Sequence, residues 1–470
     1  MKTTKTQKLE FGTSAMKLLP KLVCHYLNLF LAFIFIFSVN PISAIPSHRL
    51  ARPPYLQNVM TDGSVFIHFK TKTACKTEVR YGKGLTDINQ KAVDKIIRTS
   101  HEIKLTALEP NRRYFYQITE SDSRGVMIPA HKDFFSFIAP SPVDPVKEIK
   151  VWVLGDPGTA IAQDFQKYFK KTQVKVRDSL LEYEKTLPNL IFTLGDNVYP
   201  FGSEEYFDKA FFNIYQDIFY QVPLYTCYGN HDQGIEETAN IYAVSCPRPQ
   251  GVYFDLFNLP TKGEGGGKPS GTEAYYSVEY GPAHFVVLDT IALDCNYKQM
   301  FDWLEKDLKS VTDGKWKIVI SHYPLKSQFF DQTKKNSKIA EISEYTFKTK
   351  MLELNDKFDV DLMISGHIHT YQRTFPVKDG RIRSHFSAKI SEANTSRYDR
   401  HEGTIYMLAG TAGSAWTNSK LKHSSFTAKA LGKPGALILK IRADSLAVSF
   451  LSDSAKVLDH FKIKNNERRI

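Results

Sequence analysis

Five short polar clusters follow five short apolar runs in this chain, and this repetition most limits how it can fold. The runs cover 151–154, 190–194, 222–228, 318–320 and 360–364, and they have the length and composition of buried strands. The clusters are Gly155-Asp156-Pro157-Gly158, Gly195-Asp196-Asn197-Val198-Tyr199, Gly229-Asn230-His231-Asp232, Val319-Ile320-Ser321-His322 and Ser365-Gly366-His367-Ile368-His369. Functional sites of open α/β sheets assemble at the carboxyl ends of strands, so we expect the five clusters to meet in space.

The side chains of these clusters are those of a site for two metal ions. Two cations about 3.5–4 Å apart need a bridging anion between them, and Asp196 is our candidate for that bridge. His367 and His369 are two residues apart, so on an extended segment they point the same way, roughly 6.6 Å from each other. Imidazoles suit divalent transition metals, whereas carboxylate and phenolate oxygens suit harder ions, which predicts two different metal positions.

The order of these motifs resembles the metallophosphoesterases and, within them, the purple acid phosphatases. The common form of the superfamily opens with Asp-x-His, but here Gly158 stands two residues after Asp156, and a tyrosine, Tyr199, stands three residues after Asp196. That exchange is typical of the purple acid phosphatases. The resemblance covers nearly all of the chain after residue 50.

The resemblance implies a ligand set and a catalytic group. A ferric ion would be held by Asp156, Asp196, Tyr199 and His369. A divalent ion, which could be iron, zinc or manganese, would be held by Asp196, Asn230, His322 and His367. His231 would protonate the departing alkoxide or stabilise the transition state, although a neighbour of a ligand can also serve only to orient it.

Each of these residues has a more ordinary interpretation when taken alone. An Asp after a Gly is most often a turn residue, and a histidine beside an apolar run is most often a hydrogen-bonded core residue. The coincidence of five clusters favours the metal site. Two details depart from the plant type: Asp232 stands where many relatives carry Glu, and the segment after His322 lacks the further histidines of large plant members. Substrate contacts of those members therefore cannot be transferred.

The chain is predicted to hold two folded domains. Residues 50–139 alternate apolar and polar with turn residues between, which indicates a β-sandwich, and the segment 52–58 resembles the start of the fibronectin type III-like domain of large purple acid phosphatases. Prolines punctuate a linker at 140–145. From 147 to 470, strands alternate with helical stretches at 162–186, 203–219 and 297–311, which predicts an α/β catalytic domain. The resemblance implies two mixed sheets flanked by helices.

The N-terminal segment, residues 1–44, reads as an export signal or leader. Five lysines precede an apolar run at 27–39, and a small residue, Ala44, stands at a plausible cleavage point. The run is short for a membrane span, so we expect no stable span once the leader is removed, although an uncleaved anchor is the alternative. The expected location is secreted, periplasmic or otherwise extracytoplasmic.

Charge and cysteine content add weaker constraints. The formal net charge of +12 would attract anionic phosphate esters, but the basic residues form no stripe and no nucleic-acid motif is present, so we expect no nucleic-acid partner. Of the five cysteines, Cys227 lies in an apolar run and is predicted to be a buried thiol. Cys246 and Cys295 could form a disulfide in an exported protein.

These observations predict an exported acid phosphatase that cleaves phosphomonoesters at a binuclear Fe(III)–M(II) centre, with attack by a metal-bound hydroxide. A phosphodiesterase of the same superfamily is the first alternative. A non-catalytic binding or adhesion protein built on the β-sandwich is the second. The complete ligand set argues against the second, because such a protein has no physical need for seven ordered ligands.

Overall fold

The structure is a computed structural model. It describes residues 50–121, 126–127, 134–144, 148–158, 166–233, 251–291, 293–325, 341–383, 396–413, 415, 421 and 424–465. The expected leader and Cys246 lie outside these ranges, and so does the side chain of Cys295, so the disulfide stays a prediction. Ser47–Ile470 form one compact unit.

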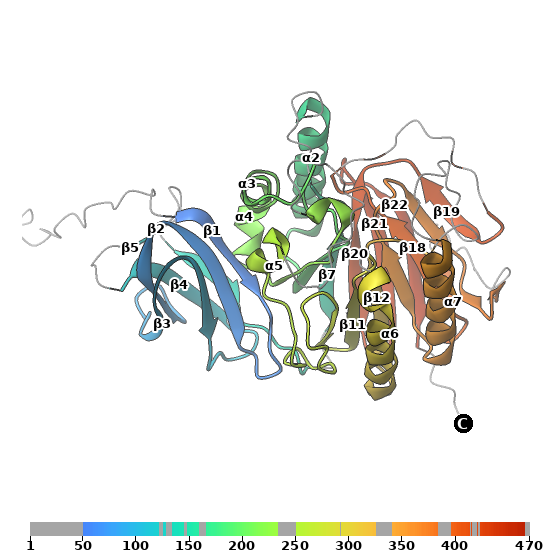
Figure 1. Ribbon diagram of the computed structural model, residues 1–470, viewed down its shortest axis with the longest axis horizontal. Coiled ribbons are helices and arrows are strands. Elements are labelled where there is room, and N and C mark those ends of the chain that lie inside the picture. The colour runs from blue at the N-terminus through green and yellow to red at the C-terminus, as the bar shows by residue number, and fades with distance from the viewer. Residues whose placement is uncertain are drawn as a thin grey trace, which may run out of the picture. The chain divides into compact units, whose positions relative to one another are not determined.

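The N-terminal region is all β, as the alternation predicts (Figure 1). Its six strands are β1 Leu50–Gln57, β2 Val65–Gly82, β3 Gln90–Leu105, β4 Arg113–Glu120, β5 Val126–Met127 and β6 Phe135–Ile138. They are hydrogen-bonded into a single sheet, in which the first half of β2 pairs with β1 and the second half with β4. Register shifts between Lys70 and Thr77 mark the change of partner. The fibronectin type III-like arrangement stays a prediction.

The region after residue 148 contains two mixed seven-stranded sheets, which confirms the expected architecture. One sheet has the order β17-β22-β21-β20-β7-β8-β9, and its members are β7 Ile149–Leu154, β8 Leu190–Thr193, β9 Leu224–Tyr225, β17 Ser396–Asp399, β20 Gly435–Arg442, β21 Ser445–Ser452 and β22 Val457–Lys464. The other has the order β10-β11-β12-β13-β18-β14-β19, and its members are β10 Tyr276–Tyr280, β11 Ala283–Leu288, β12 Trp316–Ser321, β13 Leu362–Ser365, β14 Tyr371–Thr374, β18 Ile405–Ala409 and β19 Thr427–Leu431. A small ribbon, β15 Val377–Lys378 and β16 Arg381–Ile382, stands apart.

Apolar side chains of the two sheets pack against each other, and helices cover their outer faces. Phe192 of β8 stacks on Phe285 of β11 with ring centroids 4.7 Å apart. On the second sheet, Val286 and Val319 belong to a separate apolar cluster with residues of α6 Leu293–Ser310 and α7 Glu341–Lys357 (Figure 1). The first sheet is covered by α2 Gln166–Glu184, which contacts β20 and β21. Burial of these faces is the main force that holds the sheets in place.

The remaining helical segments are short. The stretch predicted as one helix at 203–219 is α3 Glu204–Tyr206, a π-helical segment Phe207–Phe212 and α4 Asn213–Phe219. A 3₁₀ turn covers Asn230–Asp232, and α5 covers Val252–Leu256. Within the described ranges, no helix has both the length and the apolar composition needed to cross a membrane.

Candidate metal centre

The five polar clusters all lie at the carboxyl ends of strands that run parallel to at least one neighbour. Three follow β7, β8 and β9 of the first sheet, and two follow β12 and β13 of the second. Because the two sheets pack face to face, both sets of strand ends meet at one edge. The structure therefore brings together the side chains that the sequence predicted to meet, from segments more than 200 residues apart.

Three of the candidate ligands sit in tight turns directly after their strands. Asp156, Asp196 and His367 have φ angles of 51°, 50° and 67°, in the left-handed region. This conformation costs a residue with a side chain roughly 1–2 kcal/mol. Such outliers persist only where the surrounding structure fixes them, and they gather at functional sites. Here the turn directs each side chain toward the others.

The first group of candidate ligands is organised around the hydroxyl of Tyr199. It donates to Asp196 Oδ2 at 2.9 Å and lies 3.4 Å from Asp156 Oδ1 and 3.0 Å from His369 Nε2. His369 Nε2 is itself 3.5 Å from Asp156 Oδ1. These are the four residues that the resemblance assigns to a ferric ion.

The second group is organised around the amide oxygen of Asn230. His322 Nε2 lies 2.9 Å from Asn230 Oδ1, and His367 Nδ1 lies 3.1 Å from the same atom. His322 Nε2 is also 3.3 Å from Asp196 Oδ1. The potential ligand atoms of Asp196, His322 and His367 all lie within 4.8 Å of one another. Asp196 thus contacts the first group through Oδ2 and the second through Oδ1.

The donor atoms fit a site for cations. His322 Nδ1 lies 2.8 Å from the carbonyl oxygen of Leu194, which can only accept, so Nδ1 carries the proton. The Nε2 lone pair of the neutral ring then faces the oxygens of Asn230 and Asp196. Acceptors that face one another at such distances repel unless a proton or a cation lies between them. Carbonyl groups that fix the tautomer of a ligating histidine are common around metal sites.

Electrostatics favour the protonation states that bind metals. Burial works against the charged form of Asp196, but the pKa of this carboxyl is still lowered to about 2, because the neighbouring histidines attract its charge when they are protonated and the backbone N–H of His231 donates to it. Burial lowers the pKa of His367 to about 3, so its imidazole is neutral at ordinary pH. Burial and the charges of Asp196 and Asp156 raise the pKa of the Tyr199 phenol well above its ordinary value. Ionisation of this phenol therefore calls for a strong Lewis acid.

His231 lies beside the candidate ligands without joining them. Its backbone N–H donates to Asp196 Oδ1 at 2.9 Å, and its Nδ1 lies 2.7 Å from the carbonyl oxygen of Pro200, so Nδ1 is the donor there. Its ring centroid is 4.3 Å from that of Tyr199, and the side chain is only partly buried. The ring is held in one orientation with Nε2 left for other contacts.

Asp232 joins two of the ligand-bearing loops. Its carboxyl accepts the backbone N–H of Asn197 at 2.8 Å, the Asn197 amide at 2.9 Å and the backbone N–H of Gly229 at 2.7 Å. Burial raises the pKa of Asp232 well above its ordinary value. The shorter side chain noted in the sequence thus connects the Asp196 loop to the Asn230 loop.

A sixth loop at the site was missed because its described residues at 410–413 supply no candidate ligand. It follows β18, and Gly413 N donates to the backbone oxygen of Asp156 at 3.0 Å. A Cβ atom on Gly410 would lie 2.7 Å from Asp156 Oδ2 and 2.7 Å from the oxygen of Ile368. The available signal was an apolar run followed by glycine, the same pattern as in the other clusters.

Gly410→Ala should weaken binding of the metal next to Asp156. The added methyl group must displace Asp156 or the backbone at Ile368, and such overpacking costs about 1–3 kcal/mol. Metal content and thermal unfolding would be measured together. Gly84→Ala is the control, because its nearest contact would be an ordinary 3.7 Å. A full metal content in Gly410→Ala would show that the close contact between Gly410 and Asp156 is not critical for metal binding.

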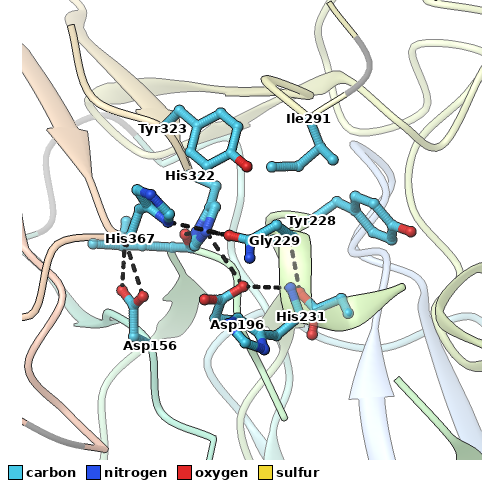
Figure 2. A network of polar contacts seen from close by, with 12 residues as sticks. Asp156, Asp196, Tyr228, Gly229, His231, Ile291, His322, Tyr323 and His367 are labelled. Carbon is cyan, nitrogen blue, oxygen red and sulfur yellow. Dashed lines mark hydrogen bonds and ion pairs between the residues drawn. The ribbon is translucent and has the colours of Figure 1, made fainter. Parts of the chain in front are cut away.

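Tyr323 is a second residue that sequence reasoning did not single out. Its ring centroid is 4.5 Å from that of His367, and its backbone N–H donates to Thr290 Oγ1 at 2.8 Å. Figure 2 shows it on the same side of the ligands as Ile291. The second group of candidate ligands therefore has an aromatic neighbour.

Comparison with known proteins agrees with the fold. Residues 149–371 match the family model of the calcineurin-like phosphoesterases. The chain thus carries a calcineurin-like phosphoesterase domain. Among its relatives are "Probable inactive purple acid phosphatase 27" of Arabidopsis thaliana, 24% identical over 69% of this chain and 51% of that protein, and "Acid phosphatase type 7" of Mus musculus, 23% identical over 67% of this chain and 64% of that protein. The chain spans about half the length of the Arabidopsis relative.

The fold is also similar to that of a solved purple acid phosphatase, PPD1 from yellow lupin seeds, with a TM-score of 0.67 over 88% of this chain and 74% of that one at 19% identity. These findings confirm the resemblance to the purple acid phosphatases that the motifs indicated.

Proposed function

We propose that this protein is a purple acid phosphatase that hydrolyses phosphomonoesters at a binuclear centre of ferric iron and a divalent metal. The observation that carries the proposal is the convergence of seven candidate ligands in two groups that share Asp196. The phosphoesterase domain and the relatives named acid phosphatases support the reaction class. The names of several plant relatives describe those proteins as inactive, so turnover is the property to test.

In this proposal each metal position has its own chemistry. Asp156, Asp196, Tyr199 and His369 would hold ferric iron, since three of the four offer oxygen donors. Asp196, Asn230, His322 and His367 would hold iron, zinc or manganese as the divalent ion. When bound, the two cations would supply a nucleophile near neutral pH and offset the charge that develops on the phosphoryl group.

The protein itself would orient the ester and assist the leaving group. The hydrogen bond to Pro200 fixes the ring of His231, and its backbone N–H holds the shared carboxylate of Asp196. A histidine in this position can donate a proton from Nε2 to the departing alkoxide. Because its ring lies against Tyr199, it would act next to the ferric position.

The central experiment combines three measurements on the purified protein. Metal analysis should find two ions, one of them iron, and the oxidised protein should show a visible absorption band. Release of the alcohol should be faster from a monoester than from a diester of the same alcohol, and inorganic phosphate should appear with the alcohol of the monoester. A full metal complement with a faster diester would favour a phosphodiesterase. No turnover of either ester would contradict the proposed activity.

Replacement of His231 should separate catalysis from metal binding. His231→Ala should keep both metals, because this side chain does not lie among the candidate ligands, and should lower turnover by roughly 10²–10⁴. The loss should be largest for alcohols that leave poorly. His401→Ala, a change at an exposed histidine near Asp359, is the control. An equal loss for activated and unactivated esters would argue against proton donation.

Export of the protein is part of the proposal. It depends on the leader expected at residues 1–44, which lies outside the described residues. The mass of the N-terminal peptide tests it directly, when it is measured on protein recovered both from inside the source cells and from outside them. Full-length protein retained in the cytoplasm would contradict this part.

A further inference from the structure

The first strand of the N-terminal β region is fastened to α5 of the region that carries the metal site. The hydroxyl of Tyr55 donates to the backbone oxygen of Leu256 at 2.6 Å. Two further hydrogen bonds follow along the chain: Asn258 N donates to Gln57 Oε1 at 3.0 Å, and Asn58 Nδ2 donates to Asn258 Oδ1 at 2.6 Å. Tyr55 and Leu256 are both buried, so the hydrogen bond between them is shielded from water.

The same strand is also held by a buried charge, that of Arg52. Arg52, 1% exposed, donates to Glu204 Oε1 at 2.8 Å and to Asp208, and its guanidinium lies 4.8 Å from the ring centroid of Phe212. Phe212 also packs on Tyr55, with centroids 4.5 Å apart. The strand therefore presents Tyr55 to α5 from a fixed position.

From α5 the contacts continue to the loop that bears Asn230. The hydroxyl of Tyr253 lies 2.7 Å from Thr226 Oγ1 and donates to the Thr226 backbone oxygen at 2.9 Å. Its ring is 4.8 Å from that of Tyr228, and the ring of Phe254 stacks on Tyr228 at 5.3 Å. Tyr228 precedes Asn230 by two residues, so α5 packs against the base of this loop.

The loop of Asn230 is also joined to the loop of Asp196. Cys227 N donates to Thr193 Oγ1 at 3.3 Å, and Asn197 Nδ2 donates to the backbone oxygen of Cys227 at 3.0 Å. A shift at Thr226 would therefore move Asn230 relative to the other candidate ligands. Metal sites tolerate such shifts poorly, because affinity depends on ligand geometry.

We propose that the N-terminal β region positions Asn230 for the divalent metal, through Tyr55, α5 and Tyr253. Tyr55 and Tyr253 are positioning residues, since neither lies among the candidate ligands. The inference rests on the proposed function in one respect, namely that Asn230 is a ligand of the divalent ion. The β region would then contribute to the geometry of the metal site, and would not be merely an accompanying domain.

Removal of one hydroxyl tests the proposal. Tyr55→Phe keeps the ring but leaves the oxygen of Leu256 without this donor. A buried hydrogen bond of this kind corresponds to roughly a three- to tenfold change in an equilibrium constant. The divalent ion, added as zinc or manganese to iron-loaded protein, should bind about that much more weakly. Iron content and the visible band should stay as in the unmodified protein.

Tyr116→Phe is the matched control. Tyr116 lies in β4, and its buried hydroxyl donates to the backbone oxygen of Tyr220 at 3.1 Å, which also joins the β region to the α/β region. That contact is made with the residue that follows α4, and not with α5 directly. Tyr116→Phe should lower the stability of the protein to a similar extent as Tyr55→Phe, and it should leave the affinity for the divalent metal unchanged. Tyr253→Phe should weaken binding of the divalent ion. In the double variant Tyr55→Phe/Tyr253→Phe, the loss of affinity should be less than the sum of the two single losses.

Hydrogen exchange of the metal-free protein gives a readout that needs no activity. Amides at 226–230 and 253–258 should exchange faster in Tyr55→Phe than in Tyr116→Phe. Equal divalent affinity and equal exchange in these two variants would overturn the inference while leaving the proposed function intact. A protein that binds no divalent ion even without substitution would overturn the proposed metal centre, and the inference would fall with it.

Discussion

Asp196→Ala should yield a protein that retains neither metal ion and releases phosphate no faster than the metal-free enzyme. The structure gives a reason for the double loss, because the two carboxylate oxygens face different groups. Oδ2 accepts the hydrogen bond from Tyr199, and Oδ1 lies 3.3 Å from His322 Nε2. Without this anion, two neighbouring cations would repel each other with no shared charge to offset the repulsion.

Asp156→Ala provides the comparison within the same site. Asp156 contacts Tyr199, His369 and the backbone N–H of His367, but no contact joins its carboxylate to His322 or Asn230 among the described interactions. This variant should lose iron and keep at least part of the divalent ion. Metal content after dialysis, measured with the folded fraction, distinguishes the two carboxylates. Two tightly held ions in Asp196→Ala would refute the bridge.

The strands that end at the site could be predicted from the sequence, because their prediction depends only on local patterns. The runs at 151–154, 190–194, 318–320 and 360–364 fall on β7, β8, β12 and β13. A short, mainly apolar run that ends at a polar cluster indicates a buried strand whatever lies around it. The buried thiol of Cys227 is confirmed for the same reason.

The run at 222–228 was longer than the strand it predicted, since β9 covers only Leu224–Tyr225. Beyond Tyr225 the backbone oxygen of Thr226 accepts hydrogen bonds from the hydroxyls of Tyr253 and Tyr276 instead of pairing in the sheet. Those partners lie 27 and 50 residues away along the chain. An apolar pattern reports burial, and it does not tell whether neighbouring strands or side chains satisfy the backbone.

The helix at 203–219 shows a second limit. Its apolar residues suggested one regular helix, but residues 207–212 form a π-helical segment in which Phe207, Phe211 and Phe212 are buried. Asp208 in this segment pairs with Arg52 from the β region. A local widening of a helix of this kind depends on tertiary contacts, which no local period encodes. The left-handed turns at Asp156, Asp196 and His367 were hidden for the same reason.

Tyr199→Phe should abolish the colour of the oxidised, iron-loaded protein while leaving the fold in place. A phenolate bound to ferric iron gives a ligand-to-metal charge-transfer band that carboxylate, amide and imidazole ligands cannot supply. Burial and two nearby carboxylates hold the phenol protonated in the metal-free protein, so only a strongly acidic cation would ionise it. In the unmodified protein the ring centroids of Tyr199 and His231 are 4.3 Å apart. Phenylalanine keeps this packing and removes only the oxygen.

Tyr323→Phe is the matched control for this experiment, since its ring contacts His367 of the other group and the substitution also removes a single hydroxyl. The visible spectrum of this variant should match that of the unmodified protein, and Tyr199→Phe should keep its divalent ion. If the native protein carried ferric iron without the band, or if Tyr199→Phe retained it, Tyr199 could not be an iron ligand. The centre would then be that of a metallophosphoesterase without the tyrosine-bound iron that distinguishes the purple enzymes.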